Sequence, residues 1–379
     1  THGNLVANVR LLKEMFAMSA ESSVVSWLPM YHDMGLVGTI ILPVYVGAPC
    51  YKMSPAAFLQ RPMRWLQAIT RYRGRITAGP NFAYDLCVSK ATPEVLAELD
   101  LSSWQVAVTG AEPVRAETME RFTRTFAPCG FKEATFHPSY GLAEATLIVS
   151  GKRGAVPPGT LAVDGAVLVS CGRPAPETTV RIMDAEDHTA CEPGRVGEVW
   201  VSGPAVAAGY WQRTEETART FGNVLDGQRY LRTGDLGFVH EGELYITGRL
   251  KDLMIIRGQN HYPQDVEWAV QDSHPAIRPG CCAAFSADLD GEERICVVAE
   301  VERQFRNHDL SEVVRAIRQR VVEQHGVQVY SVVLLRPATM PKTSSGKIQR
   351  QACKRAYRDG TLEALRIDIN HRVIISERE

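Results

Sequence analysis

Short apolar segments alternate with amphipathic helical segments through the first 137 residues, and this alternation constrains the fold more than any other feature. Strand patterns at 105–109 and 134–137 flank a helical pattern at 115–126, and the same alternation is found upstream. Strands separated by helices form βαβ units, so we expect an α/β fold with a mostly parallel sheet. Ligands of such sheets bind at the carboxyl ends of the strands.

The pattern changes twice farther along the chain. After residue 167, short strand patterns stand between Gly- and Pro-rich turns, which suggests a small β subdomain. A third region, with helical patterns at 264–271 and 310–325, begins near Gly248. A chain of 379 residues exceeds one ordinary core. We therefore expect a large domain over 1–247, divided at about 166/167, and a small α+β domain over 248–379.

Charge and cysteine content exclude several classes of protein. The chain has 42 Lys and Arg against 43 Asp and Glu, so bulk electrostatics would not hold nucleic acid. Nine cysteines without a C-x-x-C pair favour a reducing cytoplasm over a disulfide scaffold. The most apolar run, 34–50, contains Pro43 and three glycines, so we expect a buried strand with flanking turns rather than a stable membrane insertion.

A polar loop over 341–348, P-K-T-S-S-G-K-I, is the strongest local signal for chemistry. Hydroxyls and a glycine before Lys347 suggest a loop that offers donors to a phosphate. The loop is not a P-loop, because Pro341 and Ile348 occupy the positions that need Gly and Ser or Thr. Taken alone, the loop is better interpreted as a solvated turn before a helix.

Three further motifs contain candidate binding residues. Asp235, in R-T-G-D-L-G, could accept the hydroxyls of a ribose, although such an Asp more often caps its own turn. In S-Y-G-L-A-E-A-T, Tyr140 could stack on a base and Glu144 could reach a phosphate-bound Mg²⁺. A core Tyr and a surface Glu are the alternative. His32, in Y-H-D-M-G, could orient a substrate, but a His beside an Asp in a turn is more often structural.

Together these motifs, in this order and at these separations, resemble the adenylate-forming superfamily of acyl-CoA synthetases, luciferases and peptide-synthetase adenylation domains. Within it, the chain looks most like the fatty acyl-AMP ligases. The likeness covers nearly the whole chain and rests on W-L-P-M-Y-H-D-M-G-L (27–36), T-A-G-P-N-F-A-Y-D (77–85), S-Y-G-L-A-E-A-T (139–146), G-R-L-K-D-L-M-I-I-R-G-Q-N-H-Y-P-Q-D (248–265) and P-K-T-S-S-G-K-I-Q-R (341–350).

The resemblance implies a two-step enzyme with a small, mobile C-terminal domain. ATP and Mg²⁺ first activate a fatty acid to an acyl-adenylate, with release of pyrophosphate. The acyl group then passes to the phosphopantetheine of an acyl carrier protein or polyketide synthase. A serine hydrolase or a zinc protease has no support, because neither G-x-S-x-G nor H-E-x-x-H occurs.

The resemblance also implies a role for each matching residue. Tyr140 should stack on adenine, Asp235 should hold the ribose with the help of Arg249, and Glu144 should bind Mg²⁺. Lys347 should bridge the acyl carboxylate and the α-phosphate. Gly110, Ala111 and Glu112 should line the base, and Lys251 should lie at the hinge near 249–252. The segment 77–85, which contains Gly79 and Phe82, should border the acyl site, and His32 should contact the substrate.

Two departures from the family pattern leave alternatives open. The phosphate loop of the superfamily would lie just before the opening T-H-G-N-L, so we expect the chain to be part of a longer protein. The insertion that follows Y-G-L-A-E in fatty acyl-AMP ligases corresponds to only a short stretch at about 150–169. A fatty acyl-CoA synthetase therefore stays an alternative, although N-H-Y-P-Q-D favours the acyl-AMP ligase. A non-catalytic acyl- or nucleotide-binding module is the other alternative.

Overall fold

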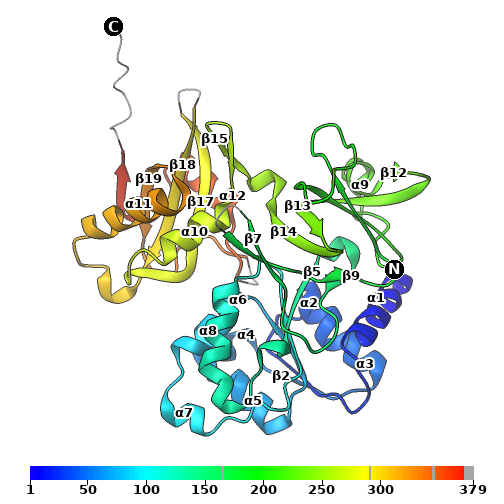
Figure 1. The fold of residues 1–379 in the computed structure, drawn as a ribbon. Coiled ribbons are helices and arrows are strands. Elements are labelled where there is room, and N and C mark those ends of the chain that lie inside the picture. Colours follow the sequence, from blue (N-terminus) through cyan, green and yellow to red (C-terminus); the bar gives the residue numbers. More distant parts are fainter. Residues whose placement is uncertain (164–165, 290–291, 344–345, 371–379) are drawn as a thin grey trace. The chain divides into compact units, whose positions relative to one another are not determined.

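A computed structural model describes residues 1–163, 166–289, 292–343 and 346–370. The chain forms two compact units, Thr1–Thr247 and Gly248–Glu379, and each is described below by itself (Figure 1). Ser344 and Ser345 of the predicted phosphate-contacting loop and residues 371–379 of the predicted small domain lie outside the described residues.

The first unit is built on a seven-stranded sheet of order β2-β1-β3-β4-β5-β6-β9. Neighbouring strands from β2 to β5 run parallel, and β6 and β9 join antiparallel, which confirms the predicted α/β fold with a mostly parallel sheet. Gly79 is in register with Thr109, and Thr109 with Pro138, so β3 and β4 end side by side and β5 continues past them to Gly141. The strands are β1 (Val24–Ser26), β2 (Cys50–Lys52), β3 (Ile76–Gly79), β4 (Val106–Thr109), β5 (Phe136–Gly141), β6 (Ile148–Gly151) and β9 (Arg173–Pro174).

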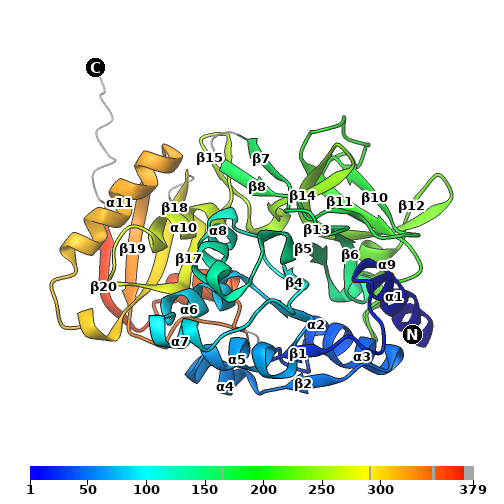
Figure 2. The same ribbon diagram turned by 60° about the horizontal axis from the view of Figure 1, so that its bottom comes forward.

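Amphipathic helices cover this sheet and bury their apolar stripes against it. Figure 2 shows α6 (Asn81–Ser89) and α8 (Ala116–Phe126) side by side. Tyr84 of α6 and Phe122 of α8 are wholly buried, with ring centroids 5.1 Å apart. The other helices are α1 (His2–Met15), α4 (Pro55–Gln60), α5 (Met63–Tyr72) and α7 (Pro93–Ala97), with 3-10 turns at Ala127–Cys129 and Glu133–Thr135.

The prediction of a buried strand in the apolar run 34–50 is wrong. The run forms α2 (Asp33–Leu36), the π-helical segment η1 (Val37–Ile41) and α3 (Leu42–Val46) before β2 begins at Cys50. A short apolar run cannot be assigned to strand or helix by periodicity alone. Gly35 is required in this segment, because a Cβ there would lie 1.9 Å from the Pro29 carbonyl oxygen.

The β-rich part of the first unit follows the large sheet. Its five-stranded sheet contains β10 (Thr179–Met183), β11 (Gly197–Ser202), β12 (Asn223–Leu225), β13 (Gln228–His240) and β14 (Glu243–Arg249), with α9 (Thr214–Phe221) packed on β13. β9 still belongs to the large sheet, so that sheet extends a few residues beyond the expected division at 166/167. The 150–169 stretch contains the end of β6 and a hairpin of β7 (Thr160–Val163) and β8 (Ala166–Val169).

The second unit is a four-stranded sheet with helices on both faces. Val297 and Ile317 lie in the core between the sheet and α11, and Phe285, Met340 and Cys353 lie in the core on the α12 side. The sheet has the order β17 (Ile277–Leu289), β18 (Glu292–Val301), β19 (Val329–Leu335) and β20 (Ala364–Ile369). The other elements are β15 (Met254–Ile256), β16 (Gln259–His261), α10 (Pro263–Gln271), α11 (Ser311–His325) and α12 (Arg350–Arg358), with 3-10 turns at Leu250–Asp252 and Arg303–Phe305.

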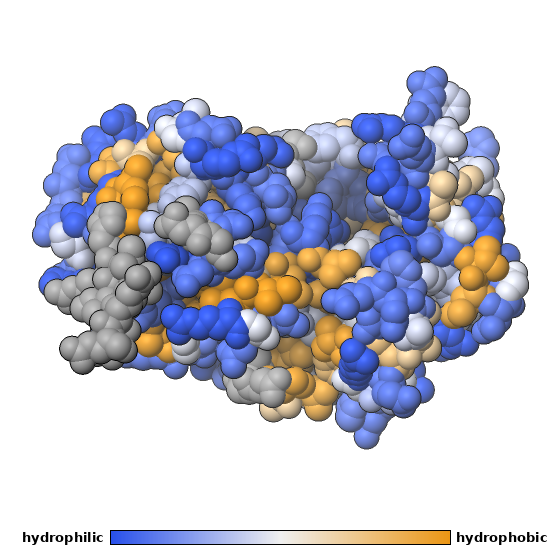
Figure 3. All heavy atoms as spheres, turned by 90° about the horizontal axis from the view of Figure 1, so that it is seen from above, coloured by the Kyte–Doolittle hydropathy of each residue, from blue (hydrophilic) through white to orange (hydrophobic). Residues whose placement is uncertain are grey.

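The face drawn in Figure 3 is largely hydrophilic, with apolar residues exposed in separate groups. The exposed large apolar side chains include Trp211, by 87%, and Val44, by 78%. Within the ranges that the structure describes, every helix is too short or too polar to cross a lipid bilayer.

Candidate functional site

Tyr140 and Asp235 meet at the carboxyl end of the parallel sheet. Tyr140 is near the end of β5 and Asp235 lies in β13, and the Tyr140 hydroxyl donates a 2.7 Å hydrogen bond to Asp235 Oδ2. Both residues are buried, with 8% and 5% of their surfaces exposed. The structure thus brings together the predicted adenine and ribose contacts.

A buried ion pair supports the turn that contains Asp235. Gly234 has φ +67°, a conformation that favours glycine, and its N–H donates to Glu198 Oε1 at 3.1 Å. The Glu198 carboxylate also accepts from Arg232 Nε at 3.0 Å and from Trp200 Nε1 at 3.0 Å. A carboxylate that is only 2% exposed needs such partners, and here the same contacts fix the Asp235 turn.

The loop after β4 brings its backbone against β5. A Cβ at Gly110 would lie 2.5 Å from the Ser139 carbonyl oxygen, so only glycine fits this approach. Ala111 follows with φ +68°, a left-handed conformation in which a side chain costs free energy. The backbone therefore turns sharply just after β4 ends at Thr109, where it approaches Ser139 of β5.

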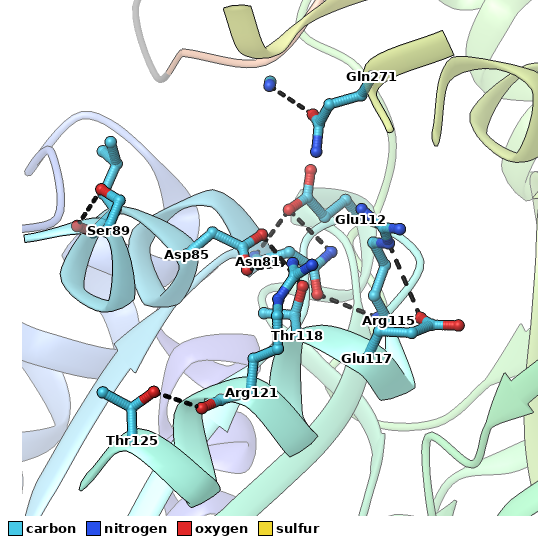
Figure 4. A network of polar contacts seen from close by, with 12 residues as sticks. Asn81, Asp85, Ser89, Glu112, Arg115, Glu117, Thr118, Arg121, Thr125 and Gln271 are labelled. Atoms are coloured by element: carbon cyan, nitrogen blue, oxygen red, sulfur yellow. Dashed lines mark hydrogen bonds and ion pairs between the residues drawn. The ribbon is translucent and has the colours of Figure 1, made fainter. Parts of the chain in front are cut away.

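Asn81 holds this loop in place from the start of α6 (Figure 4). Its Nδ2 donates to Glu112 Oε1 at 3.0 Å and to the Pro113 carbonyl at 2.8 Å, and its Oδ1 accepts from Arg115 N–H at 3.0 Å. The Asn81 N–H also donates to Glu112 Oε1 at 2.8 Å. Glu112, which is predicted to line the base, is exposed, and the two hydrogen bonds from Asn81 fix the position of its carboxylate.

One turn later in α6, Asp85 fixes α8 against α6. Its carboxylate accepts from Thr118 Oγ1 at 3.0 Å and from Arg121 Nη2 at 2.7 Å. Figure 4 shows these side chains pointing toward one another between the two helices. The loop at 110–115 is therefore supported both by Asn81 and by the helices on either side of it.

Glu144, the predicted Mg²⁺ ligand, lies half-buried in the 3-10 turn Ala143–Ala145. Its Oε1 accepts a 2.7 Å hydrogen bond from the hydroxyl of Tyr210. Burial, together with this carboxylate, raises the pKa of Tyr210 to about 12. No group of three or more potential ligands occurs among the residues described. A single carboxylate suits Mg²⁺ that is held mainly by nucleotide phosphates and water, so the donor set fits that ion.

The predicted acyl-site residues lie near an aromatic cluster. A Cβ at Gly79 would lie 3.2 Å from Trp65 Cη2, and the Phe82 ring centroid lies 5.9 Å from that of Trp27. Trp27 stacks on Phe58 at 4.1 Å. His32 caps α2, with Nδ1 3.3 Å from the Met34 nitrogen and 2.7 Å from Asp33 Oδ1. These are the contacts expected of a histidine that caps a helix, which is the structural alternative for His32.

The second unit contains the predicted lysine loop. Lys347 N–H donates to Thr343 Oγ1 at 3.1 Å, Thr343 N–H donates back to the Lys347 carbonyl at 2.8 Å, and a β-bridge pairs Lys342 with Ile348. Lys342 Nζ lies 2.8 Å from the Gly280 carbonyl and 3.1 Å from Cys281 Sγ. These contacts shape the described part of the loop and attach it to β17.

The predicted hinge residues are exposed. Arg249 ends β14, and Lys251 lies in the 3-10 turn Leu250–Asp252. Next to it, Asp252 pairs with Arg350, which also forms an ion pair with Glu267 at 2.6 Å. Arg249, Lys251 and Lys347 all lie in the second unit, so each is placed within that unit alone.

Three residues with a part in the site were not predicted from sequence. Asn81, Tyr210 and Lys342 each act through a partner at least 31 residues away in the chain. Asn81 lies in the 77–85 motif and Lys342 lies in the 341–350 motif. Their positions within these motifs could have indicated a role for both residues. Tyr210 follows A-A-G in a segment that none of the motifs includes.

Comparison with known proteins identifies the family. A family model described as "AMP-binding enzyme" matches residues 1–211, and one described as "Disco-interacting protein 2-like, AMP domain" matches residues 251–367. Among curated proteins, the medium-chain-fatty-acid–[acyl-carrier-protein] ligase JamA of Moorena producens is 47% identical, over 96% of this chain and 65% of the relative. The long-chain-fatty-acid–AMP ligase FadD32 of Mycolicibacterium smegmatis is 37% identical, over 96% of this chain and 66% of the relative.

Solved structures agree with this result. A structure from work on fatty acyl-adenylate ligases of E. coli and L. pneumophila matches with a TM-score of 0.86 and 33% identity, over 95% of this chain and 67% of that one. The fatty acid AMP ligase of Legionella pneumophila matches with a TM-score of 0.67 and 42% identity, over 97% and 68%. The chain spans 60–66% of the length of the first three curated relatives. It belongs to the AMP-binding enzymes and, among the adenylate-forming families, to the fatty acyl-AMP ligases.

Proposed function

We propose that the protein containing this chain activates a fatty acid with ATP, giving a fatty acyl-adenylate and pyrophosphate. The acyl group is then passed to the phosphopantetheine thiol of an acyl carrier protein, in polyketide or lipid biosynthesis in the cytoplasm. The observation that carries the proposal is the Tyr140–Asp235 hydrogen bond at the carboxyl edge of the parallel sheet, beside the Gly110 turn. This contact supports nucleotide binding there, because sheets of this kind bind their ligands at the carboxyl ends of the strands.

Six residues bind the nucleotide in this proposal. Tyr140 offers its ring to adenine, with Gly110, Ala111 and Glu112 along the edge of the base. Asp235 accepts the ribose hydroxyls, assisted by Arg249. The Tyr140 hydroxyl donates a hydrogen bond to Asp235, so this one contact orients both the ring and the carboxylate.

The chemistry of the first step is mainly electrostatic. A carboxylate that attacks the α-phosphate brings two anions together, so positioning and charge compensation lower the barrier. Lys347 donates to the acyl carboxylate and the α-phosphate, and its loop must approach the nucleotide by domain closure about Lys251. Glu144 would hold Mg²⁺, which supplies positive charge to the phosphates when bound.

The name of one relative favours a second candidate, a fatty acyl-CoA synthetase. A putative fatty-acid–CoA ligase, fadD21 of Mycobacterium leprae, is 39% identical over 94% of this chain. The 150–169 stretch is also short, as noted above. The names of JamA and of the Teredinibacter turnerae ligase TtuA, both of which specify the acyl carrier protein, support the first candidate.

The experiment that tests the proposal separates these candidates. The full-length protein is incubated with ATP, Mg²⁺ and a series of fatty acids, with CoA in one tube and a phosphopantetheinylated carrier protein in another, and products are followed by mass spectrometry. We expect acyl-AMP that persists with CoA and is transferred to the carrier. Formation of acyl-CoA would support the second candidate, and the absence of any adenylate would contradict both and favour a binding module.

A further inference from the structure

We propose that Tyr210 is a positioning residue that orients the Glu144 carboxylate toward the divalent cation. The inference rests on the proposed function, in which Glu144 holds Mg²⁺. Tyr210 lies outside the five motifs that carry the family resemblance.

The 203–213 loop contacts Glu144 through both its side chain and its backbone. The Tyr210 hydroxyl donates to Glu144 Oε1 at 2.7 Å, and the Ala207 N–H donates to the Glu144 carbonyl at 2.8 Å. A third contact follows two residues later, where Thr146 Oγ1 donates to the Ala205 carbonyl at 2.6 Å. The loop therefore fixes the 3-10 turn of Glu144 as well as the direction of its carboxylate.

Tyr210 is itself held firmly by α9. Its N–H donates to Thr217 Oγ1 at 2.9 Å, the same hydroxyl donates to the Tyr210 carbonyl at 3.3 Å, and its ring packs edge-on against Phe221 at 5.2 Å. Gly209 permits this close packing, because a Cβ there would lie 2.2 Å from Thr217 Cγ2. These contacts hold the Tyr210 backbone and ring, and they therefore fix the position of the hydroxyl that donates to Glu144.

The geometry gives the bond a role beyond folding. Tyr210 is 37% exposed and Glu144 is half-buried, so the bond lies near solvent and its loss leaves no polar group sealed in the core. A hydroxyl bonded to one oxygen fixes the plane of the carboxylate and leaves the other oxygen for a cation. Hydrogen bonds of this kind to metal-binding groups are typically worth roughly 10–100-fold in metal affinity or activity.

The test compares Tyr210→Phe with the wild-type full-length protein. The substitution removes only the hydroxyl and keeps the ring that packs on Phe221. The first measurement is Mn²⁺ affinity by electron paramagnetic resonance in the presence of a non-hydrolysable ATP analogue. The second is the Mg²⁺ concentration that gives half-maximal acyl-adenylate formation. We expect both to shift by roughly tenfold toward weaker binding, with the melting temperature nearly unchanged.

Tyr245→Phe is the control, because Tyr245 is another tyrosine of the first unit with a hydrogen-bonded hydroxyl, here paired with Ser170. It should leave both metal measurements unchanged. Wild-type Mn²⁺ affinity in Tyr210→Phe, or equal weakening in both variants, would overturn the inference. A wild-type protein that binds Mn²⁺ with the analogue but adenylates no fatty acid would instead contradict the proposed function, and the Mn²⁺ comparison would still decide the role of Tyr210.

Discussion

The hydroxyl of Tyr140 lies 2.7 Å from Oδ2 of Asp235, although the two residues are 95 positions apart in the chain. The bond joins the end of a parallel strand of the large sheet to the long antiparallel strand β13. Each residue therefore has a structural partner in addition to its proposed ligand. The nucleotide would meet a ring and a carboxylate whose relative positions are fixed before it binds, which lowers the ordering cost of binding.

Removing the Tyr140 hydroxyl should weaken nucleotide binding. In Tyr140→Phe the ring remains for stacking, but the Asp235 carboxylate loses the donor that fixes its position relative to that ring. Hydrogen bonds to charged groups contribute about 1.5–3 kcal/mol, so we expect ATP affinity to fall by roughly tenfold, measured by calorimetry on the full-length protein.

Tyr230→Phe provides the comparison, because Tyr230 is also a buried residue of β13 and its hydroxyl contacts Gln228 at 3.4 Å. This variant should bind ATP as the wild type does. If both variants lost affinity equally, the effect would come from destabilised β13 rather than from Asp235.

Asn81 should be important for both stability and nucleotide affinity. Asn81→Ala removes three side-chain hydrogen bonds and leaves the Arg115 N–H and the Pro113 carbonyl without this partner. We expect a loss of about 2–3 kcal/mol in the free energy of unfolding, measured by denaturant titration. ATP affinity should also fall, because the 110–115 loop is no longer held.

Asn223→Ala is a control for this substitution, since Asn223 also donates two hydrogen bonds to backbone carbonyls, at Arg219 and Thr220, within the β-rich part. Its effect on stability should be smaller and its effect on ATP affinity absent. Unchanged ATP affinity in Asn81→Ala would show that the loop keeps its shape without Asn81.

The sequence predicted those parts of the fold that depend on local pattern. Strand–helix alternation indicated the parallel sheet, and the positions of Gly110 and Tyr140 at strand ends placed them at one edge. The apolar run 34–50 was misassigned, because the periodicity of a short apolar run does not distinguish a strand from a helix. The close approach of Gly35 to the Pro29 carbonyl is a property of the folded chain that the pattern does not report. The Tyr210–Glu144 bond joins residues 66 positions apart, and no local pattern reports such a pairing.

Acid should destabilise the first unit through His137. Burial, together with the positive charge of Lys152, lowers the pKa of this imidazole to about 4, below its ordinary value near 6.5. The folded state therefore favours neutral His137. Its contribution to stability is present above pH 6.5 and is lost as the pH falls toward 4, by about 3 kcal/mol in total.

His137→Phe should reduce this dependence on pH. Thermal unfolding at pH 7.5 and pH 5.0 should show a smaller drop in melting temperature for this variant than for the wild type. His240→Phe, a change at an exposed histidine of the same unit, should behave as the wild type. An equal drop in all three proteins would assign the acid sensitivity to other groups.

Lys342 should control the position of the lysine loop in the second unit. Lys342→Ala removes the contacts of Nζ with the Gly280 carbonyl and with Cys281 Sγ. We expect slower adenylation with unchanged ATP affinity. The rate at which Cys281 reacts with an alkylating reagent should also change, because Lys342 lies against this thiol, which is only 2% exposed, and burial raises the pKa of the thiol while the positive charge of Lys342 lowers it. Unchanged alkylation and unchanged rate together would show that the loop does not depend on this anchor.

Lys347→Ala separates chemistry from binding. The proposed role of Lys347 is to donate to two anions that approach each other in the transition state, whereas Tyr140 and Asp235, the main proposed contacts of the base and the ribose, belong to the first unit. We therefore expect acyl-adenylate formation to fall by at least about a hundredfold, while calorimetry shows ATP affinity within a few-fold of the wild type. Lys354→Ala, on α12 of the same unit, should retain the wild-type rate. A variant at Lys347 that lost ATP binding and adenylation to the same extent would refute the role given to this residue.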